Sequence, residues 1–301
     1  MEIIKLYLIL FGVSIFFQAS IVYLFKKKKI FQNIYNLSPQ SHQKKSSTPS
    51  MGGVGMLLTI GVSFFMFNQS AESQWLIIVV FLFGFIGLLD DGLSLILGKN
   101  QGLRTAQKFG IQVLFSVWVL GLYSYQINEL SVWEFVLYAF CFTGMSNATN
   151  LTDGLDGLLA GSSILTLGGF LCLMLSYQFN SGVTFVVCVM ISVISFLFFN
   201  RHPALIFMGD TGSLFLGAFF CALSILLGNI WIIIPFCALY ILEAVSVIVQ
   251  VLYFKWSKKR IFLMSPIHHH YELLGLKETT IVLLLWCVQL GFIVYAFSYL
   301  I

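Results

Sequence analysis

The chain has 301 residues, of which 59% are hydrophobic and 9% are charged, and its formal net charge is +4. A soluble domain has about 25% charged residues, so this composition excludes an ordinary soluble protein and indicates an integral membrane protein. Its apolar runs are longer than the ~10-residue alternating strands of a membrane barrel, so we expect an all-α fold. The six cysteines lie inside apolar runs without metal-ligand spacing, and we interpret them as packing residues.

Ten segments are apolar and long enough to predict membrane-spanning helices, which need ~20 residues each. In chain order they are 3–25, 52–68, 75–92, 108–126, 132–148, 158–178, 183–199, 212–228, 230–255 and 279–300. The first is too long for a cleavable signal peptide, and lysines follow it instead of preceding it. The ninth contains Pro235, which removes a backbone donor, so we expect a kink or break there. The sequence therefore predicts a single polytopic membrane domain over residues 1–301.

The basic residues predict the orientation of this domain. If the N-terminus lies outside the cell, 15 of the 16 Lys and Arg residues fall on the cytoplasmic side, and only Lys5 lies outside. Such an asymmetry is typical of cytoplasmic loops. With ten spans the C-terminus also lies outside. All five aspartates and all five histidines then fall at the cytoplasmic edge, where we expect an active site.

Lysines and glycines cluster between the first two predicted spans, in the stretch HQKKSSTPSMGGVGM (42–56). Lys44 and Lys45 precede a Gly-rich turn that enters the second span. Basic residues at the inner surface commonly do no more than fix topology. The alternative is that these lysines also hold phosphate.

Two adjacent carboxylates, Asp90 and Asp91, stand where the third predicted span leaves the membrane. Acids at a helix C-terminus oppose the helix macrodipole, and neighbouring acids repel each other. A solvated helix end is one interpretation of the pair. The cost of holding both acids at a lipid boundary favours the other, which is a bound cation or a role in proton transfer.

Acids and amides alternate between the fifth and sixth spans, in NATNLTDGLDGLLAG (147–161). Asp153 and Asp156 are three residues apart and each precedes a glycine, while Asn147 and Asn150 have the same spacing. Residues at this spacing share a helical face, and glycines let the backbone approach a ligand closely. An ordinary Asp-Gly turn is the alternative. As ligands, hard oxygen atoms of this kind favour Mg²⁺ over zinc.

Asp210 lies just before the eighth span, in FFNRHPALIFMGDTGSLFLG (198–217), with Thr211 and Ser213 as cap candidates. It is either a simple N-cap or part of a site where a helix N-terminus binds phosphate. Three consecutive histidines, 268–270, follow the ninth span in KRIFLMSPIHHHYELLG. They do not converge as zinc ligands, and no cysteine is near. They line a phosphate or nucleotide pocket, or they belong to a solvated loop.

Taken together, four predicted cytoplasmic loops bring five aspartates, several amides and surrounding basic residues to one face of the membrane. Phosphoryl transfer needs this combination: Mg²⁺ to neutralise phosphate oxygens, a base for the attacking group, and cations for the remaining charge. Because the site lies at the membrane boundary, we expect one substrate to be a lipid phosphate.

Six segments resemble, in the same order, the signature segments of the phospho-N-acetylmuramoyl-pentapeptide transferase family. They are STPSMGG, LLDDGL, QGLRTAQK, NATNLTDGLDGL, FFNRHPALIFMGDTGSL and KRIFLMSPIHHHYELLG. The resemblance spans residues 42 to 280. The aspartate segments resemble the whole polyprenyl-phosphate N-acetylhexosamine-1-phosphate transferase superfamily (glycosyltransferase family 4), whereas PIHHHYELLG resembles the muramoyl-pentapeptide branch.

The resemblance implies that undecaprenyl phosphate attacks the β-phosphate of UDP-MurNAc-pentapeptide, giving lipid I and UMP in the first membrane step of peptidoglycan synthesis. It also implies Mg²⁺ dependence, ten transmembrane helices, commonly a homodimer, and a multi-pass location in the bacterial cytoplasmic (inner) membrane. No nucleic-acid partner is expected.

The resemblance further assigns roles to single residues. Asp210 is the main Mg²⁺ ligand with Asp153 beside it, and Asp90 is the candidate base on the lipid phosphate with Asp91 next to it. Nucleotide- or substrate-binding roles are implied for Lys45, Asn150, Asp153, Asp156, Asn200, Phe207, Gln250, His268, His269 and His270. Phe207 is expected to stack on uracil and the histidines to lie at the phosphate or sugar, while Glu243 matches a polar position of the ninth span.

One departure from the family pattern is Ser94, which stands where relatives usually carry a lysine. Lys108 matches the family, and Lys99 is a candidate substitute for the missing charge. Two alternatives stay open: a transferase that uses UDP-GlcNAc, and a transporter. A transporter holds ionisable residues near the bilayer midplane, where this chain has only Glu243.

Overall fold

The computed structural model describes residues 2–28, 30, 48–67, 70–97 and 102–300. Helices make up the architecture, and the described residues contain no β-strand. The first half consists of α1 (Glu2–Lys27), α3 (Gly53–Met66), α4 (Ala71–Leu97), α5 (Thr105–Gln126) and α6 (Val132–Thr152). The second half consists of α7 (Leu158–Ser176), α8 (Val183–Asn200), α9 (Asp210–Leu226), η1 (Ile230–Ile232), α10 (Ile233–Phe236), α11 (Ala238–Ser257), α12 (Ile267–Leu273) and α13 (Glu278–Leu300).

Each predicted span coincides with a helix or, for the ninth, with a run of three. Within the described residues, seven helices are long and apolar enough to cross a membrane: α1, α4, α5, α7, α8, α11 and α13. The apolar helices α3 and α9 are shorter, at 14 and 17 residues. The all-helical, polytopic fold class is confirmed, while the count of ten spans and their orientation stay predictions.

The ninth predicted span is broken near Pro235. The chain passes from η1 through α10 and resumes as α11, with Cys237 out of helical geometry between them (φ −124°, ψ 22°). Gln289 of α13 satisfies the backbone groups at this break, since its side-chain oxygen accepts from the Leu239 N–H and its nitrogen donates to the Phe236 carbonyl. Broken helices inside a membrane need such partners because lipid offers none. The predicted break is therefore confirmed.

Helix α9 forms the centre of the molecule. Every residue from Thr211 to Leu226 is buried, and the helix packs mainly against α4 and α6. A helix that is apolar on all sides is stable only when it is surrounded. Its N-terminal end is also where the predicted aspartate sites meet, so the centre of the packing positions the site.

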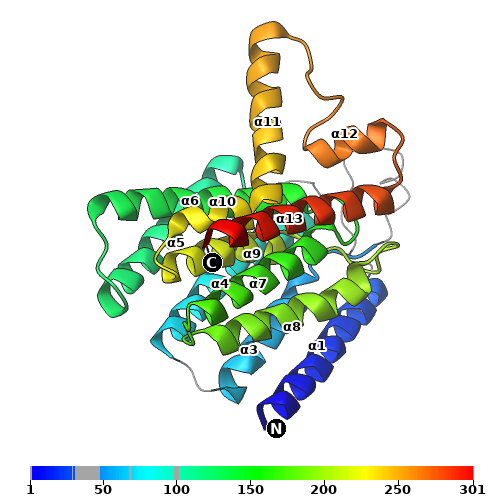
Figure 1. Ribbon diagram of the computed structural model, residues 1–301. Coiled ribbons are helices and arrows are strands. Elements are labelled where there is room, and N and C mark those ends of the chain that lie inside the picture. Colours follow the sequence, from blue (N-terminus) through cyan, green and yellow to red (C-terminus); the bar gives the residue numbers. More distant parts are fainter. Residues whose placement is uncertain (1, 29, 31–47, 68–69, 98–101, 301) are drawn as a thin grey trace.

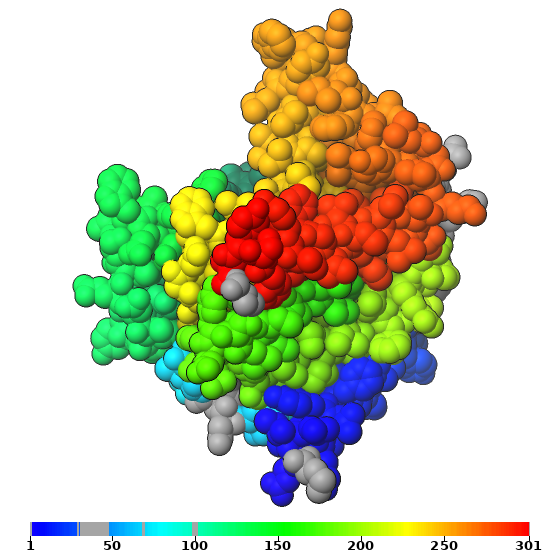
Figure 2. Space-filling model, in the orientation of Figure 1, coloured from blue at the N-terminus to red at the C-terminus, as the bar shows by residue number. Residues whose placement is uncertain are grey.

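Helix α11 projects away from the other helices, and α12 lies beside its base (Figure 1). The space-filling view shows the same projection as a distinct arm above α13 (Figure 2). Large apolar side chains on this arm are exposed, among them Leu252 and Trp256. Exposed apolar residues along a helix of this kind are suited to contact with lipid.

Candidate active site

Asp210, the first residue of α9, is the point where three helices meet. Its carboxylate is paired with the ammonium group of Lys108 from α5. It also accepts a hydrogen bond from the side-chain amide of Asn150 on α6, with an N–O distance of 2.7 Å. The same amide reaches the hydroxyl of Ser213, one turn further along α9. The structure thus brings Asn150 and Asp210 into direct contact, although 60 residues separate them.

Asp91 caps the N-terminus of α9 from the neighbouring helix α4. Its carboxylate accepts from the backbone N–H of Asp210 at 3.1 Å and of Thr211 at 2.9 Å, and from the Thr211 hydroxyl at 2.6 Å. The sequence predicted that residues of α9 itself would cap this helix. The N-cap residue is instead Gly209, which has no side chain that could accept a hydrogen bond. A carboxylate at this end also complements the helix dipole, which is positive there.

Close approach of α4 to α9 depends on a glycine one turn before the acidic pair. A Cβ added at Gly87 would overlap the backbone carbonyl of Asp210, which leaves no room for a side chain. The short distance between the backbones is what allows Asp91 to reach the first turn of α9. The stretch GLLDD therefore contains both the acids and the residue that admits them to the site.

Asp90 has a different environment from its neighbour. Its carboxylate accepts from the backbone N–H of Leu103 at 2.7 Å and lies 3.5 Å from the ammonium nitrogen of Lys108. Lys108 therefore stands between the carboxylates of Asp90 and Asp210, all three side chains being about one-fifth exposed. Of the two adjacent acids, Asp91 is hydrogen-bonded to the first turn of α9, whereas Asp90 faces the ammonium group of Lys108.

Asp153 follows the last residue of α6 and lies close to the same carboxylates. Burial, together with the negative charges of Asp210 and Asp91, raises the pKa of the Asp153 carboxyl well above its ordinary value. A cation bound among these acids would offset that repulsion. The donor set of carboxylate and amide oxygens is of the kind that Mg²⁺ prefers.

Asp156 and Asn200 are predicted to line the nucleotide cleft, and both are buried at 3% exposure. The Asp156 carboxylate contacts His202 Nδ1 at 2.9 Å and accepts from the Ala204 N–H. The Asn200 side chain accepts from the Gly157 N–H and donates to the Ile206 carbonyl. In this conformation both side chains tie the α6–α7 turn to the α8–α9 loop.

Glu278, the first residue of α13, joins this cluster. One oxygen accepts from the Asp156 N–H at 2.8 Å, and the other lies 3.3 Å from His202 Nδ1. Among the described residues, Asp156, His202 and Glu278 form a group whose ligand atoms all lie within 4.8 Å of one another, close enough to hold a metal ion. The sequence interpretation missed it, since no pattern in the sequence joins residues from three separate segments.

The remaining substrate-site predictions fall on two other parts of the fold. The Phe207 backbone exchanges hydrogen bonds with Pro49 and Gly52, which places its half-buried side chain beside the start of α3. His268 is fully buried, His269 pairs with Glu272 at 2.6 Å, and His270 accepts from the Leu263 N–H. Lys45 and Lys99 lie outside the described residues.

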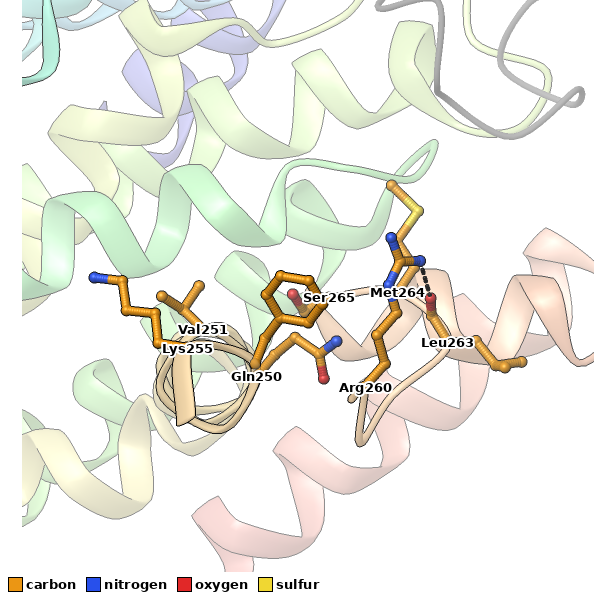
Figure 3. A pocket seen from close by; sticks show the side chains of 8 residues that line it. Gln250, Val251, Lys255, Arg260, Leu263, Met264 and Ser265 are labelled. Atoms are coloured by element: carbon orange, nitrogen blue, oxygen red, sulfur yellow. Dashed lines mark hydrogen bonds between the residues drawn. The ribbon is translucent and has the colours of Figure 1, made fainter. Parts of the chain in front are cut away.

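Gln250 lines a mostly apolar pocket at the far end of α11. The pocket has a volume of about 470 Å³ and is closed on one side by the α11–α12 connection (Figure 3). Its lining consists of Gln250, Val251, Phe254, Lys255, Arg260, Leu263, Met264 and Ser265. The Gln250 oxygen accepts from the N–H groups of Ile261 and Phe262, so this side chain shapes the connection. None of the aspartates contributes to this pocket.

Clustered carboxylates at the end of a buried apolar helix, with a lysine between them, are the arrangement expected of a membrane-bound transferase. The chain belongs to glycosyl transferase family 4, whose sequence model matches residues 73–228. That range contains Asp90, Asp91, Lys108, Asn150 and Asp210, so the family resemblance seen in the sequence is confirmed.

Curated relatives sharpen the comparison. The chain is 38% identical over 310 residues to a phospho-N-acetylmuramoyl-pentapeptide-transferase of Bacillus subtilis (strain 168), covering 96% of each chain. It is 37% identical to the protein of that name from Bacillus velezensis, again over 96% of each chain. A third, from Bacillus thuringiensis (strain Al Hakam), is 38% identical over 92% of this chain and 91% of its own length.

Proposed function

We propose that the chain transfers phospho-MurNAc-pentapeptide from UDP-MurNAc-pentapeptide to undecaprenyl phosphate, giving lipid I and UMP. The observation that carries this proposal is the convergence of Asp90, Lys108, Asn150 and Asp210 from four separate helices. Full-length similarity to relatives that bear the name of this transferase supports the choice of substrates.

The reaction joins one phosphate oxygen to one phosphorus. An oxygen of the lipid phosphate attacks the β-phosphorus of the sugar nucleotide, and the bond from that phosphorus to the bridging oxygen of UMP breaks. Asp90 accepts the proton if the attacking phosphate carries one, or orients the phosphate if it carries none. The Lys108 ammonium, 3.5 Å from Asp90, stabilises charge on the transferred phosphate.

Asp91 and Asn150 hold the other groups in place. Asp91 fixes the first turn of α9 through three hydrogen bonds, and so fixes Asp210 relative to Asp90. Asn150 holds the second oxygen of Asp210 from the opposite side. Positioning of this kind lowers the barrier because the reacting groups meet without further reorganisation.

Asp210 and Asp153 are the residues we propose for Mg²⁺. They fit the ion because Asp210 already pairs with one cation, and because Asp153 is buried beside the negative charges of Asp210 and Asp91, which together raise its pKa. When bound, Mg²⁺ neutralises phosphate oxygens and so eases both attack and departure.

Substrate binding is proposed for residues around this centre. Phe207 provides a stacking surface for uracil, and His269 and His270, which are less buried than His268, contact phosphate or sugar. Lys45 and Gln250 complete the predicted set. Asp156 and Asn200 act through the α6–α7 turn that they hold. We further propose a homodimer in the bacterial cytoplasmic (inner) membrane.

The test is release of UMP by purified protein in detergent, supplied with undecaprenyl phosphate, Mg²⁺ and UDP-MurNAc-pentapeptide. UDP-GlcNAc serves as the competing donor in a parallel reaction. We expect UMP from the first donor alone, and none after EDTA treatment. Release from UDP-GlcNAc alone would reassign the donor. Absence of release from folded protein with either donor would overturn the proposal.

A further inference from the structure

A fully buried acid, Glu243, lies inside α11 and plays no part in the chemistry described above. Its carboxylate oxygen Oε2 lies 3.1 Å from Nδ1 of His268 on α12, and both side chains have 0% exposure. Among the described residues, the other carboxylate oxygen of Glu243 and both ring nitrogens of His268 have no hydrogen bond, so the 3.1 Å approach at Nδ1 is a close contact without hydrogen-bond geometry. A buried carboxyl and a buried imidazole with unsatisfied atoms cost free energy, so packing alone does not account for them.

The free edge of the His268 ring faces the α6–α7 turn. A Cβ added at Gly154 would overlap Nε2 of His268, so the ring rests directly on the backbone of this turn. Gly154 follows Asp153, a proposed Mg²⁺ ligand, and lies four residues after Asn150, which holds Asp210. The ring is therefore a rigid support behind the turn on which two site residues depend.

We propose that Glu243 is a positioning residue of the active site: its carboxylate fixes the ring of His268, and the ring fixes the Asp153–Gly154 turn. A carboxylate placed beside Nδ1 favours one orientation of the imidazole ring, as in the outer shells of metal and triad sites. A neutral amide in place of the carboxylate interacts more weakly with the ring, so rotation about the His268 side-chain torsions becomes easier, and rotation moves the edge that touches Gly154. The catalytic part of the proposal rests on the function proposed above.

A first experiment reads the turn without any assay of activity. Hydrogen exchange is compared between the parent and Glu243→Gln for a peptide that covers 152–158. Five amides of this peptide outside helix α6 are hydrogen-bonded in the structure, those of Asp153, Gly154, Asp156, Gly157 and Leu158. We expect their exchange to be at least about fivefold faster in the variant. Exchange equal to that of the parent would overturn the proposal, even if the chain proved to have another activity.

A matched control separates this effect from the loss of any acid. Glu134→Gln makes the same chemical change at the opposite end of α6, in a capping box near residue 131. It is expected to leave exchange in 152–158 at the parent rate. A change of equal size in both variants would point to general loosening and would count against the proposal.

Kinetics then test the link to catalysis. Glu243→Gln and Gly154→Ala, which disturbs the same ring contact from the other side, are each expected to lower kcat about tenfold or more with KM for the sugar nucleotide within twofold. Gly144→Ala, on the same helix as Asn150 with open space around it, is the control for the glycine change.

The double variant decides whether the two residues act together. Because both changes act through one ring, Glu243→Gln with Gly154→Ala is expected to be no more than about twofold slower than the slower single variant. If the two single variants' losses in kcat multiply in the double variant, the proposal is overturned. A kcat for Glu243→Gln within twofold of the parent would overturn it as well. If Glu243→Gln does not fold, Gly154→Ala alone supplies both the exchange and the kinetic result.

Discussion

The two neighbouring acids of α4 illustrate how much a single residue's role depends on its partners. Asp90 and Asp91 are adjacent in the sequence, yet only Asp90 faces the lysine, whereas Asp91 accepts three hydrogen bonds from the first turn of α9. Because successive helical residues point about 100° apart, neighbours in a helix seldom share a task. The two acids are therefore expected to respond differently to the same substitution.

We expect a conservative substitution of Asp91 and a truncation of its side chain to have different effects. Asp91→Asn keeps a side-chain oxygen for the Thr211 N–H and is expected to retain the fold with reduced turnover. Asp91→Ala removes the cap, which is worth about 1 kcal/mol, and should lower the melting temperature as well. Thermal unfolding in detergent, read beside UMP release, checks both. Equal melting temperatures for the two variants would contradict the capping role.

At Asp210 the loss should be catalytic. Asp210→Asn keeps the size of the side chain but removes the charge that pairs with Lys108, and with it the proposed Mg²⁺ ligand. We expect UMP release to fall at least about 100-fold, in the range found when a charge-stabilising group is removed. The requirement for Mg²⁺ in the residual activity should weaken. Circular dichroism is expected to match the parent, and an active variant would remove Asp210 from the site.

Among the elements, the contact between α4 and α9 is the one on which the site depends most. Gly87→Ala places a methyl group where the Asp210 carbonyl lies, so the helices must separate. We expect loss of nearly all UMP release together with a lower melting temperature. Gly92→Ala is the control, because it is on the same helix and meets no atom within 4 Å. Matching behaviour of the two alanine variants would show that the close approach is unimportant.

The break before α11 is bridged by the side chain of Gln289, with the Thr166 hydroxyl as a second donor to the Phe236 carbonyl. Gln289→Leu removes a fully buried acceptor and donor that serve Leu239 and Phe236 across the break. The Leu239 N–H is then left without a partner, which costs about 1–3 kcal/mol, while the Phe236 carbonyl keeps the Thr166 hydroxyl. The variant should therefore unfold at a lower temperature than Gln289→Glu, which keeps an acceptor for Leu239. A higher melting temperature for Gln289→Leu than for Gln289→Glu would contradict this prediction.

For the molecule as a whole, the predicted threading gives a direct labelling test. In a cysteine-free background, a cysteine at Ser131 should react with an impermeant maleimide on intact cells. A cysteine at Arg201 should react only after the membrane is opened, because 15 of the 16 basic residues are expected inside. Reaction of both positions on intact cells would overturn the orientation, and with it a cytoplasmic site.

The sequence predicts the helices well because lipid imposes a simple requirement on length and hydropathy. A break near Pro235 is expected from the missing backbone donor, and the structure has it two residues later, at Cys237. The meeting of Asp90, Asn150 and Asp210 follows from their position at one edge. The individual contacts between side chains could not be predicted from the sequence. That Asp91 caps α9, that Asp156 meets His202 and Glu278, and that Glu243 meets His268 depend on helix rotation and spacing, which no local pattern in the chain records.

The projecting arm has a practical implication for anyone who purifies this protein. Twenty residues of helix make α11 about 30 Å long, and it leaves the body at a steep angle (Figure 1). A detergent micelle just large enough to surround the main body would leave α11 exposed to water. The protein would then aggregate through the exposed apolar side chains of this helix. Larger discs of bilayer should keep the preparation monodisperse where compact detergents do not.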